Sequence, residues 1–244
     1  MNISFVIPFH NEEKNCGPML ERILELGKTH KWRFEIIAVN DKSTDKTPRI
    51  LDSYASKNKN VKVLHRSRKS EELGNTMGKA LRLGTSKADG DIIIWTMGDR
   101  SDHPDTYNEI ITKLREGYDL VFASRYMTGG SKGNLDSIKA FFSRWGTNLA
   151  RALFSLPVHD ITNAFRGFKK EVFQKSKPES NDFAISPEFA LRAQLAGFKL
   201  GEVPTTYHNR VEGVSNFKLI KMIRSYLGMY LSLFITYRIL KKRV

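Results

Sequence analysis

The chain has 244 residues, of which 40% are hydrophobic and 11% aromatic, so it is long and apolar enough to bury the core of one large domain. Lys and Arg number 40 against 26 Asp and Glu, and the formal net charge of +14 favours polyanionic partners such as nucleic acid, anionic lipid or phosphorylated substrates. The single cysteine, Cys16, excludes an internal disulfide framework and fits a reducing compartment.

Apolar runs that end in turn residues alternate with amphipathic segments along the first half of the chain. The apolar runs predict strands at residues 2–8, 34–39, 61–64, 91–96 and 120–124. The amphipathic segments predict helices at residues 11–27, 47–56, 74–85 and 106–116. This alternation predicts an α/β fold in which a mainly parallel central sheet carries helices on both faces.

The most informative segment is DIIIWTMGDRSDHP, residues 91–104, in which two acids follow a strand of buried type. Ile92–Trp95 is apolar on both faces, as in a central parallel strand, and Gly98 then allows a turn that leads to Asp99 and Asp102. Open α/β sheets bind ligands beyond the carboxyl ends of their strands, and two carboxylates there suit a hard divalent cation. The alternative is a solvated loop in which Ser101 or Asp102 caps the next helix.

Polar clusters also follow the first predicted strand, at residues 11–12, and the second, at residues 41–45. Because the carboxyl ends of parallel strands lie at one edge of a sheet, we expect these clusters to converge with residues 99–102. Their amide and carboxylate groups suit the base and ribose of a nucleotide. For Asp41 and Asp45 the alternative is a local role, as turn residues and caps of the following helix.

Seven pieces of the chain, in order, resemble the family 2 glycosyltransferases of the GT-A fold. The pieces are IPFHNEE (7–13), NDKSTDKT (40–47), LGNTMGKALRLG (73–84), GDIIIWTMGDRSDHP (90–104), ASRYMTGG (123–130), DITNAFRGFKKEV (160–172) and GEVPTTYHNRVEGVS (201–215). The last three resemble the branch that contains dolichol-phosphate mannose synthase and related polyprenyl-phosphate glycosyltransferases. The resemblance implies the transfer of a hexosyl group from a nucleotide-sugar donor, with inversion, using Mg²⁺ or Mn²⁺.

The resemblance also implies roles for residues on the donor side. Pro8, Asn11 and Glu12 match the opening of the donor pocket, where the glutamate meets the nucleotide. Asp41 matches the second acid of an Asp-Asp pair that contacts the base. The first acid of that pair is Asn40 here, which departs from the family pattern.

Further positions match the part of the family site that holds the metal and the phosphates. Asp99 matches an acid of the metal motif, with Asp102 as the second expected ligand, although the common form of that motif is Asp-x-Asp. Ser124 and Arg125 match a Ser-Arg pair near the phosphates, and Arg166 matches a basic residue with the same expected role. The other expected substrate-binding positions are Gly74, Lys79, Asn163, Arg210 and Ser215.

The chemistry of the acceptor decides whether the enzyme needs a general base. Fixed guanidinium groups, such as those of Arg125 and Arg166, stabilise the charge that develops on a departing diphosphate. An acceptor phosphate has a second pKa of about 6, so it is already largely anionic at neutral pH. A sugar hydroxyl needs a carboxylate base, for which Glu188 is the best candidate. The alternative for Glu188 is an acid in the first turn of a helix, favoured by the helix dipole.

The segment that follows the seven pieces differs from the rest of the chain, so we divide the chain into a catalytic domain at 1–215 and a helical segment at 216–244. Residues 226–237 are apolar almost all round and are flanked by basic residues on both sides. The run is shorter than the roughly 20 apolar residues that a transmembrane helix needs, and it fits the interface of an anionic membrane. The alternatives are packing on the catalytic domain, on a second copy of the chain or on a membrane partner protein.

Three functions remain open from the sequence. The first is a polyprenyl-phosphate glycosyltransferase, cytoplasmic and peripheral at the inner face of the membrane. The second is a glycosyltransferase that adds a sugar to a glycan hydroxyl in cell-surface polysaccharide synthesis. The third is a non-catalytic nucleotide-sugar binder, because Asn40, Lys42 and Arg100 depart from the family pattern. No nucleic-acid partner is expected, since the sequence contains no recognisable DNA- or RNA-binding module.

Overall fold

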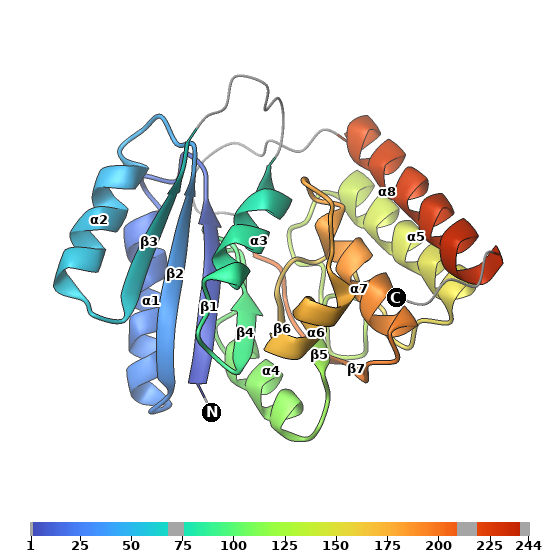
Figure 1. Ribbon diagram of the computed structural model, residues 1–244, viewed down its shortest axis with the longest axis horizontal. Coiled ribbons are helices and arrows are strands. Elements are labelled where there is room, and N and C mark those ends of the chain that lie inside the picture. The colour runs from blue at the N-terminus through green and yellow to red at the C-terminus, as the bar shows by residue number, and fades with distance from the viewer. Residues whose placement is uncertain (1, 68–75, 209–218, 240–244) are drawn as a thin grey trace.

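A seven-stranded sheet lies at the centre of the molecule, with helices on both faces (Figure 1). The computed structural model describes residues 2–67, 76–208 and 219–239. The strands are β1 (Asn2–Phe9), β2 (Arg33–Asp41), β3 (Val61–Arg66), β4 (Ile92–Trp95), β5 (Leu120–Ser124), β6 (Arg166–Lys169) and β7 (Leu200–Pro204). The helices are α1 (Cys16–Thr29), α2 (Thr47–Lys57), α3 (Met77–Ser86), α4 (Thr106–Arg115), α5 (Ser137–Phe154), α6 (Lys170–Ser176), α7 (Ile185–Leu195) and α8 (Leu219–Leu233), which continues as the π-helix η1 (Phe234–Ile239).

The strand order is β3-β2-β1-β4-β6-β5-β7, and every pairing is parallel except the two that β6 makes. In the centre, Val6 of β1 lies between Ile37 of β2 and Trp95 of β4. On the other side of β4, Trp95 is paired with Arg166 of the antiparallel strand. The α/β class and the mainly parallel sheet predicted from the sequence are therefore confirmed.

Two apolar layers hold the helices to the sheet, one on each face. Phe5 and Ile7 of β1 point into the layer that α1 and α4 cover. Val6, between them, points into the layer on the opposite face, which α3, α5, α7 and α8 cover. This alternation follows from the period of two in a strand and explains why β1 is apolar at every position from Phe5 to Phe9.

Two predicted helices begin later than expected. The helix expected from residue 11 begins at Cys16, because Asn11 has a φ of 55° and belongs to a loop. The helix expected from residue 74 begins at Met77, and Gly74 lies outside the described residues. Strand β6 was not predicted, because its four residues, RGFK, have little strand pattern of their own.

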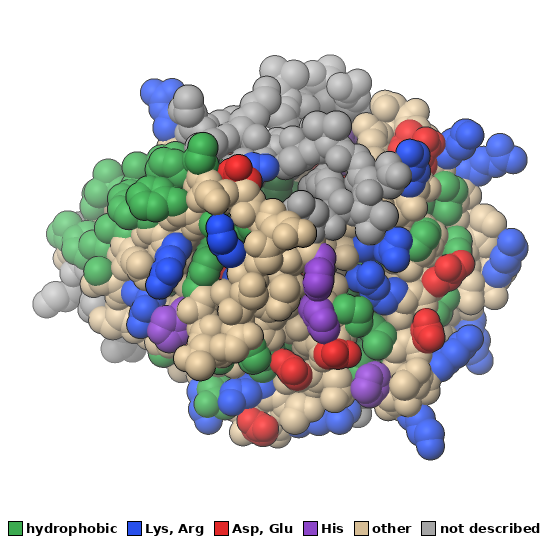
Figure 2. All heavy atoms as spheres, turned by 180° about the vertical axis from the view of Figure 1, so that it is seen from behind, with side chains coloured by type: hydrophobic (Ala, Val, Ile, Leu, Met, Phe, Trp, Pro, Cys, Tyr) green, Lys and Arg blue, Asp and Glu red, His purple; other side chains and the backbone are tan. Residues whose placement is uncertain are grey.

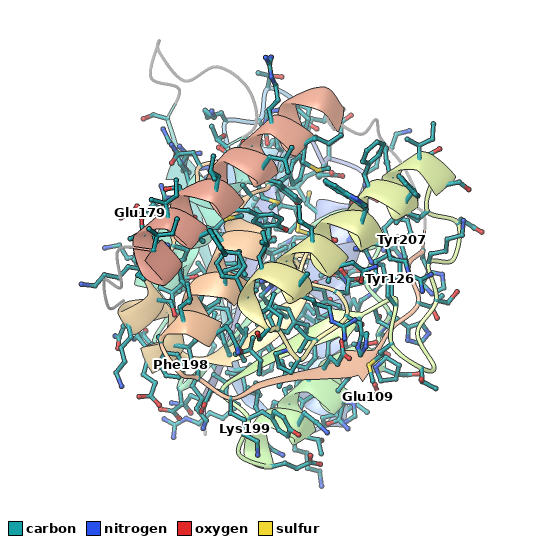
Figure 3. All side chains as sticks on the ribbon, turned by 90° about the vertical axis from the view of Figure 1, so that its right-hand side faces the viewer. Glu109, Tyr126, Glu179, Phe198, Lys199 and Tyr207 are labelled. Atoms are coloured by element: carbon teal, nitrogen blue, oxygen red, sulfur yellow. The ribbon has the colours of Figure 1, made fainter. Side chains whose placement is uncertain are left out.

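Helix α8 packs along α5 at one end of the molecule. Figure 3, viewed from that end, shows the two helices side by side in front of the sheet. Tyr226, Tyr230 and Leu233 of α8 are buried on the side that faces the body of the protein. No helix in the described ranges is long and apolar enough to cross a membrane.

Candidate active site

Three loops converge where the neighbouring parallel strands β2, β1 and β4 end. The loops after β1 and β2 are tied together by hydrogen bonds in both directions. The amide of Thr44 donates to Oδ1 of Asn11 at 2.7 Å, and the amide of Glu12 donates to Oγ1 of Thr47 at 2.8 Å. The predicted convergence of the first two polar clusters is thus present, and the loop after β4 lies beside them because β4 pairs with β1.

Each of the three loops contains one non-glycine residue with left-handed backbone. The φ angles are 55° at Asn11, 59° at Lys42 and 63° at Arg100. The other such residues within the described ranges are Lys31, Ser155 and Lys177, which follow the ends of helices, where this conformation is common. Non-glycine residues with left-handed backbone cost free energy, and away from helix ends they concentrate at functional sites. The three loops are therefore candidates for a substrate site.

The loop after β4 is built around the carboxylate of Asp102. Its Oδ2 accepts hydrogen bonds from Oγ1 of Thr96 at 2.7 Å and from the amide of Met97 at 3.0 Å. The hydroxyl of Tyr107 lies 2.5 Å from the same Thr96 hydroxyl. Burial raises the pKa of Asp102 to about 7, and the negative charge of Asp99 adds to the increase. Asp102 therefore holds the loop together from inside.

Asp99 lies in the same loop and accepts a hydrogen bond at Oδ1 from the amide of Ser101 at 3.1 Å. Gly98 precedes it for a steric reason, because a Cβ there would lie 2.5 Å from the ring of Phe9 and 2.9 Å from the carbonyl oxygen of Pro8. The loop therefore packs closely against the end of β1, where Pro8 is buried. The metal roles of Asp99 and Asp102 and the donor role of Pro8 stay predictions.

Arg22 of α1 was not identified from the sequence, yet it supports this loop. Its Nη1 donates to the carbonyl oxygens of Arg100 at 3.2 Å and of Asp102 at 3.1 Å. An arginine within an amphipathic helix has no local signature of such a role, so only the three-dimensional contact reveals it.

His208 lies close to the same loop, in the chain that follows β7. The rings of His103 and His208 stack with centroids 5.4 Å apart, and the amide of His208 donates to the carbonyl of Ser101 at 3.2 Å. Sequence reasoning did not single out either histidine. Within the described ranges, no group of three or more His, Cys, Asp or Glu side chains is arranged to hold a metal ion by itself.

The residues present nevertheless fit a divalent cation that is shared with a substrate. Mg²⁺ keeps several waters and binds through one or two carboxylates together with substrate phosphates. Asp99 and Asp102 are close enough for the charge of one to raise the pKa of the other, and a divalent cation would relieve that repulsion. Bound there, the cation would neutralise charge on a diphosphate.

On the donor side, Asp41 is already paired within the protein. One oxygen forms an ion pair with Arg66, and the other accepts a hydrogen bond from Oγ1 of Thr76 at 2.7 Å. Asp45 has the local role considered as the alternative, because its Oδ1 accepts the amide of Thr47 at 2.9 Å. The carboxylate of Glu12 accepts a hydrogen bond from Nδ2 of Asn15 at 2.6 Å, within its own loop.

Arg125 forms a buried two-pronged ion pair with Asp160. Nε and Nη2 of Arg125 lie 2.7 and 3.0 Å from the two oxygens of Asp160, and Nη2 also donates to Ser143 and Thr162. Burial alone would raise the pKa of Asp160, but the positive charge of Arg125 holds it below its usual value. Ser124 is buried beside this pair and accepts the amide of Met127 at 3.2 Å.

Arg166 is completely buried and donates to backbone carbonyls, which differs from the expected contact with substrate phosphates. Its acceptors are the carbonyl oxygens of Ser186 at 2.7 Å, Ile161 at 3.1 Å, Ala164 at 3.3 Å and Asn163. Burial lowers the pKa of Arg166 to about 9. In this conformation Arg166 joins the loop before β6 to α7 and has no surface exposed to a ligand.

Glu188 has the structural surroundings considered as the alternative. Its carboxylate accepts the amides of Glu179 at 3.0 Å and Ser180 at 2.7 Å and the Nε of Arg192 at 2.7 Å. The side chain is buried and ties the segment before α7 to that helix. A carboxylate occupied by three internal donors is poorly suited to remove a proton from an acceptor.

The remaining expected residues divide into two groups. Asn163 donates through Nδ2 to the carbonyl of Ala123 at 2.9 Å and joins the loops at the ends of β5 and β6. Lys79 lies on α3, and its amide donates to the carbonyl of Asn181 at 3.3 Å. Gly74, Arg210 and Ser215 lie outside the described residues.

The chain belongs to the family of glycosyltransferases whose profile, Glycosyl transferase family 2, matches residues 4–176. It is therefore a glycosyltransferase, as the resemblance of its motifs implied. Among its relatives is an uncharacterized glycosyltransferase of Synechocystis sp., 30% identical, over 96% of this chain and 75% of the relative.

Two relatives have names that specify an acceptor. The polyprenol monophosphomannose synthase of Mycolicibacterium smegmatis is 28% identical, over 86% of this chain and 78% of the relative. The dolichol-phosphate mannosyltransferase of Pyrococcus furiosus is also 28% identical, over 89% of this chain and 60% of the relative.

Solved structures establish the GT-A fold. The glucosyl-3-phosphoglycerate synthase of Mycobacterium tuberculosis, in complex with Mn²⁺, UDP and phosphoglyceric acid, superposes with a TM-score of 0.67 at 20% identity, over 96% of this chain and 78% of that one. The same enzyme has been crystallised with Mg²⁺ and UDP, and superposes with a TM-score of 0.66. At this identity the likeness shows the fold alone.

Proposed function

We propose that this glycosyltransferase transfers a sugar, with inversion, from a nucleotide-sugar donor to a polyprenyl phosphate at the cytoplasmic face of a membrane, using Mg²⁺ or Mn²⁺. Two relatives named for polyprenol- or dolichol-phosphate mannose transfer match more than four-fifths of the chain and support this acceptor. The single observation that carries the choice between acceptors is the internal engagement of Glu188. A phosphate acceptor needs no base, whereas a sugar hydroxyl does.

The proposed reaction forms one bond and breaks one at the anomeric carbon. An oxygen of the acceptor phosphate attacks that carbon from the face opposite the diphosphate, and the nucleoside diphosphate leaves with the bonding electrons. Asp99 and Asp102 would hold the divalent cation, which supplies positive charge to the departing diphosphate. Asn11, Glu12 and Asp41 would bind the nucleoside, and Lys79 would lie on the donor side.

The positions beyond the described residues belong to the same proposal. Gly74 would lie beside the donor, and Arg210 and Ser215 would bind the acceptor phosphate. Arg125, Arg166 and Asn163 would act as positioning residues, because their described contacts are with other parts of the protein.

The decisive experiment is a donor screen with undecaprenyl or dolichyl phosphate as the acceptor, with release of nucleoside diphosphate as the signal. We expect one donor to give a glycosylated lipid of inverted anomeric configuration. Turnover of a glycan acceptor in place of the lipid phosphate, together with loss of that turnover in Glu188→Gln, would instead establish the glycan-hydroxyl function. Binding of a nucleotide sugar without any transfer would indicate a non-catalytic binder.

Asp99→Asn tests the metal proposal. The substitution removes one negative charge from the pair, so we expect the rate to fall by a factor of about 10²–10³ or more, with little change in the melting temperature. Asp105→Asn is the matched control, since Asp105 is exposed, lies near the same loop, and its side chain accepts no capping hydrogen bond from an amide of α4. Wild-type rates in Asp99→Asn, or full activity in the presence of a chelator, would disprove the assignment.

A further inference from the structure

All the exposed large hydrophobic side chains in the described part of the chain lie on α5, α8 and η1. Phe141 of α5 is 64% exposed and Leu231 of α8 is 61% exposed. The full set is Ile138, Phe141, Trp145, Leu227, Leu231, Ile235 and Ile239. Figure 2 shows hydrophobic side chains gathered at the end of the molecule where these helices lie. An apolar cluster of this kind on an otherwise charged protein marks an interaction surface.

The exposed residues form one stripe on each helix. Ile138, Phe141 and Trp145 follow each other at intervals of three and four residues, which places them on one side of α5. Leu227 and Leu231 are four residues apart on α8, whereas the buried Tyr226 and Tyr230 form the neighbouring inward stripe. Trp145 and Leu227 line the same small depression between the helices, so the two stripes meet.

The charge of the two helices identifies the occupant. Neither α5 nor the segment from α8 to η1 contains an acidic residue, whereas α5 contains Lys139, Arg144 and Arg151. A second copy of the chain would bring a surface of the same sign, and like charges across an interface disfavour association. An anionic bilayer accepts both the apolar stripes and the basic residues beside them.

We propose that α5 and α8 together form one surface that docks on an anionic lipid bilayer. The biological purpose of this surface rests on the proposed lipid-linked acceptor, but docking itself requires neither donor nor acceptor. Helix α5 belongs to the catalytic domain, and its opposite side contacts the loop after β5: Ser143 accepts Nη2 of Arg125 at 3.1 Å, and the carbonyl of Ala140 accepts the Tyr126 hydroxyl at 3.2 Å. Docking would thus set the distance between the bilayer and the sheet edge that carries the candidate site.

The test uses the full chain and vesicles of phosphatidylcholine with or without phosphatidylglycerol. We expect the protein to sediment with the anionic vesicles and to be released by salt. Phe141→Ser and Leu231→Ser should each weaken binding by about tenfold or more, because each removes one large side chain from the lipid contact. Arg144→Gln should weaken it as well, whereas Arg115→Gln, the same change on exposed Arg115 of α4, should not.

Trp145 provides an independent readout at the centre of the surface. It is 44% exposed, whereas Trp32 and Trp95, the other two tryptophans, are buried. We therefore expect a blue shift of tryptophan emission on adding anionic vesicles, and no shift in Trp145→Phe.

Unchanged vesicle binding in both Phe141→Ser and Leu231→Ser would overturn the proposal. A wild-type dimer that Phe141→Ser dissociates, with no binding to vesicles, would also overturn it and assign the surface to self-association. Vesicle binding that depends on the stripes, in an enzyme that rejects polyprenyl phosphates, would leave docking intact and disprove the proposed acceptor.

Discussion

Arg22 joins helix α1 to the loop that carries both candidate metal ligands. Its two hydrogen bonds to the carbonyls of Arg100 and Asp102 each involve a charged donor, and such bonds contribute about 1.5–3 kcal/mol. In Arg22→Met we expect weaker binding of Mn²⁺ in the presence of nucleoside diphosphate and faster amide hydrogen exchange in the loop. Arg49→Met, on exposed Arg49 of α2, is the control. Unchanged exchange in Arg22→Met would contradict this positioning role.

The buried pair of Arg125 and Asp160 makes a prediction about pH. The pKa of Asp160 is lower in the folded chain than in the unfolded chain, so the pair stabilises the fold above about pH 4, and this contribution is lost as the pH falls through the lowered folded pKa. Asp160→Asn leaves a buried guanidinium without its partner and should cost about 3–5 kcal/mol at neutral pH. The deficit should shrink in acid, as measured by urea unfolding at several pH values; a deficit that does not change with pH would contradict the pair.

At the scale of the elements, two glycines in helices should respond in opposite ways to alanine. In Gly146→Ala the new Cβ lies 3.9 Å from the nearest side chains, Tyr226 and Tyr230, so the helix gains about 0.5–1 kcal/mol of stability. In Gly78→Ala the new Cβ lies 2.3 Å from the carbonyl oxygen of Ser180, which the protein must move to accommodate it. We expect a higher melting temperature for the first variant and a lower one for the second; the reverse order would refute this packing.

The elements with local patterns were predictable from the sequence, and those defined by distant partners were not. The strands and helices from β1 to β5 follow from apolar runs and amphipathic periodicity. Strand β6 has four residues and exists because β4 and β5 pair with it on both sides. Helix α5 was not predicted, because its exposed stripe of Ile138, Phe141 and Trp145 is apolar, whereas its buried side contains polar or small residues such as Ser143 and Thr147.

The candidate site, too, was predictable from the sequence only in part. The approach of the first two polar clusters follows from the parallel order of the strands. The partners of Arg125, Arg166 and Glu188 could not be predicted from the sequence, because Arg and Glu side chains suit either a substrate or an internal partner. Only the distances to Asp160, to the loop carbonyls and to the amides before α7 distinguish these roles.

At the scale of the whole molecule, helix α8 contributes one side to the core and another side to the surface. A chain that ends at Ser225 would lose Tyr226, Tyr230 and Leu233, which are buried against the body, and burial of an apolar side chain such as that of Leu233 contributes about 1.5–3 kcal/mol. We expect the truncated chain to melt at a clearly lower temperature, as measured by circular dichroism. A truncated chain as stable as the full one would show that α8 contributes nothing to the core.

The left-handed residues at the sheet edge imply a conflict between durability and turnover. Left-handed backbone at a non-glycine residue costs the folded state about 1–2 kcal/mol. A glycine there would avoid this cost and would stabilise the unfolded chain, through its greater conformational entropy, by only roughly 0.4–1 kcal/mol. Glycine at Arg100 would therefore make the enzyme more heat-resistant while it removes a side chain from the edge that carries the candidate site. Laboratory selection for thermal endurance alone would accept such changes, and selection for sugar transfer would reject them.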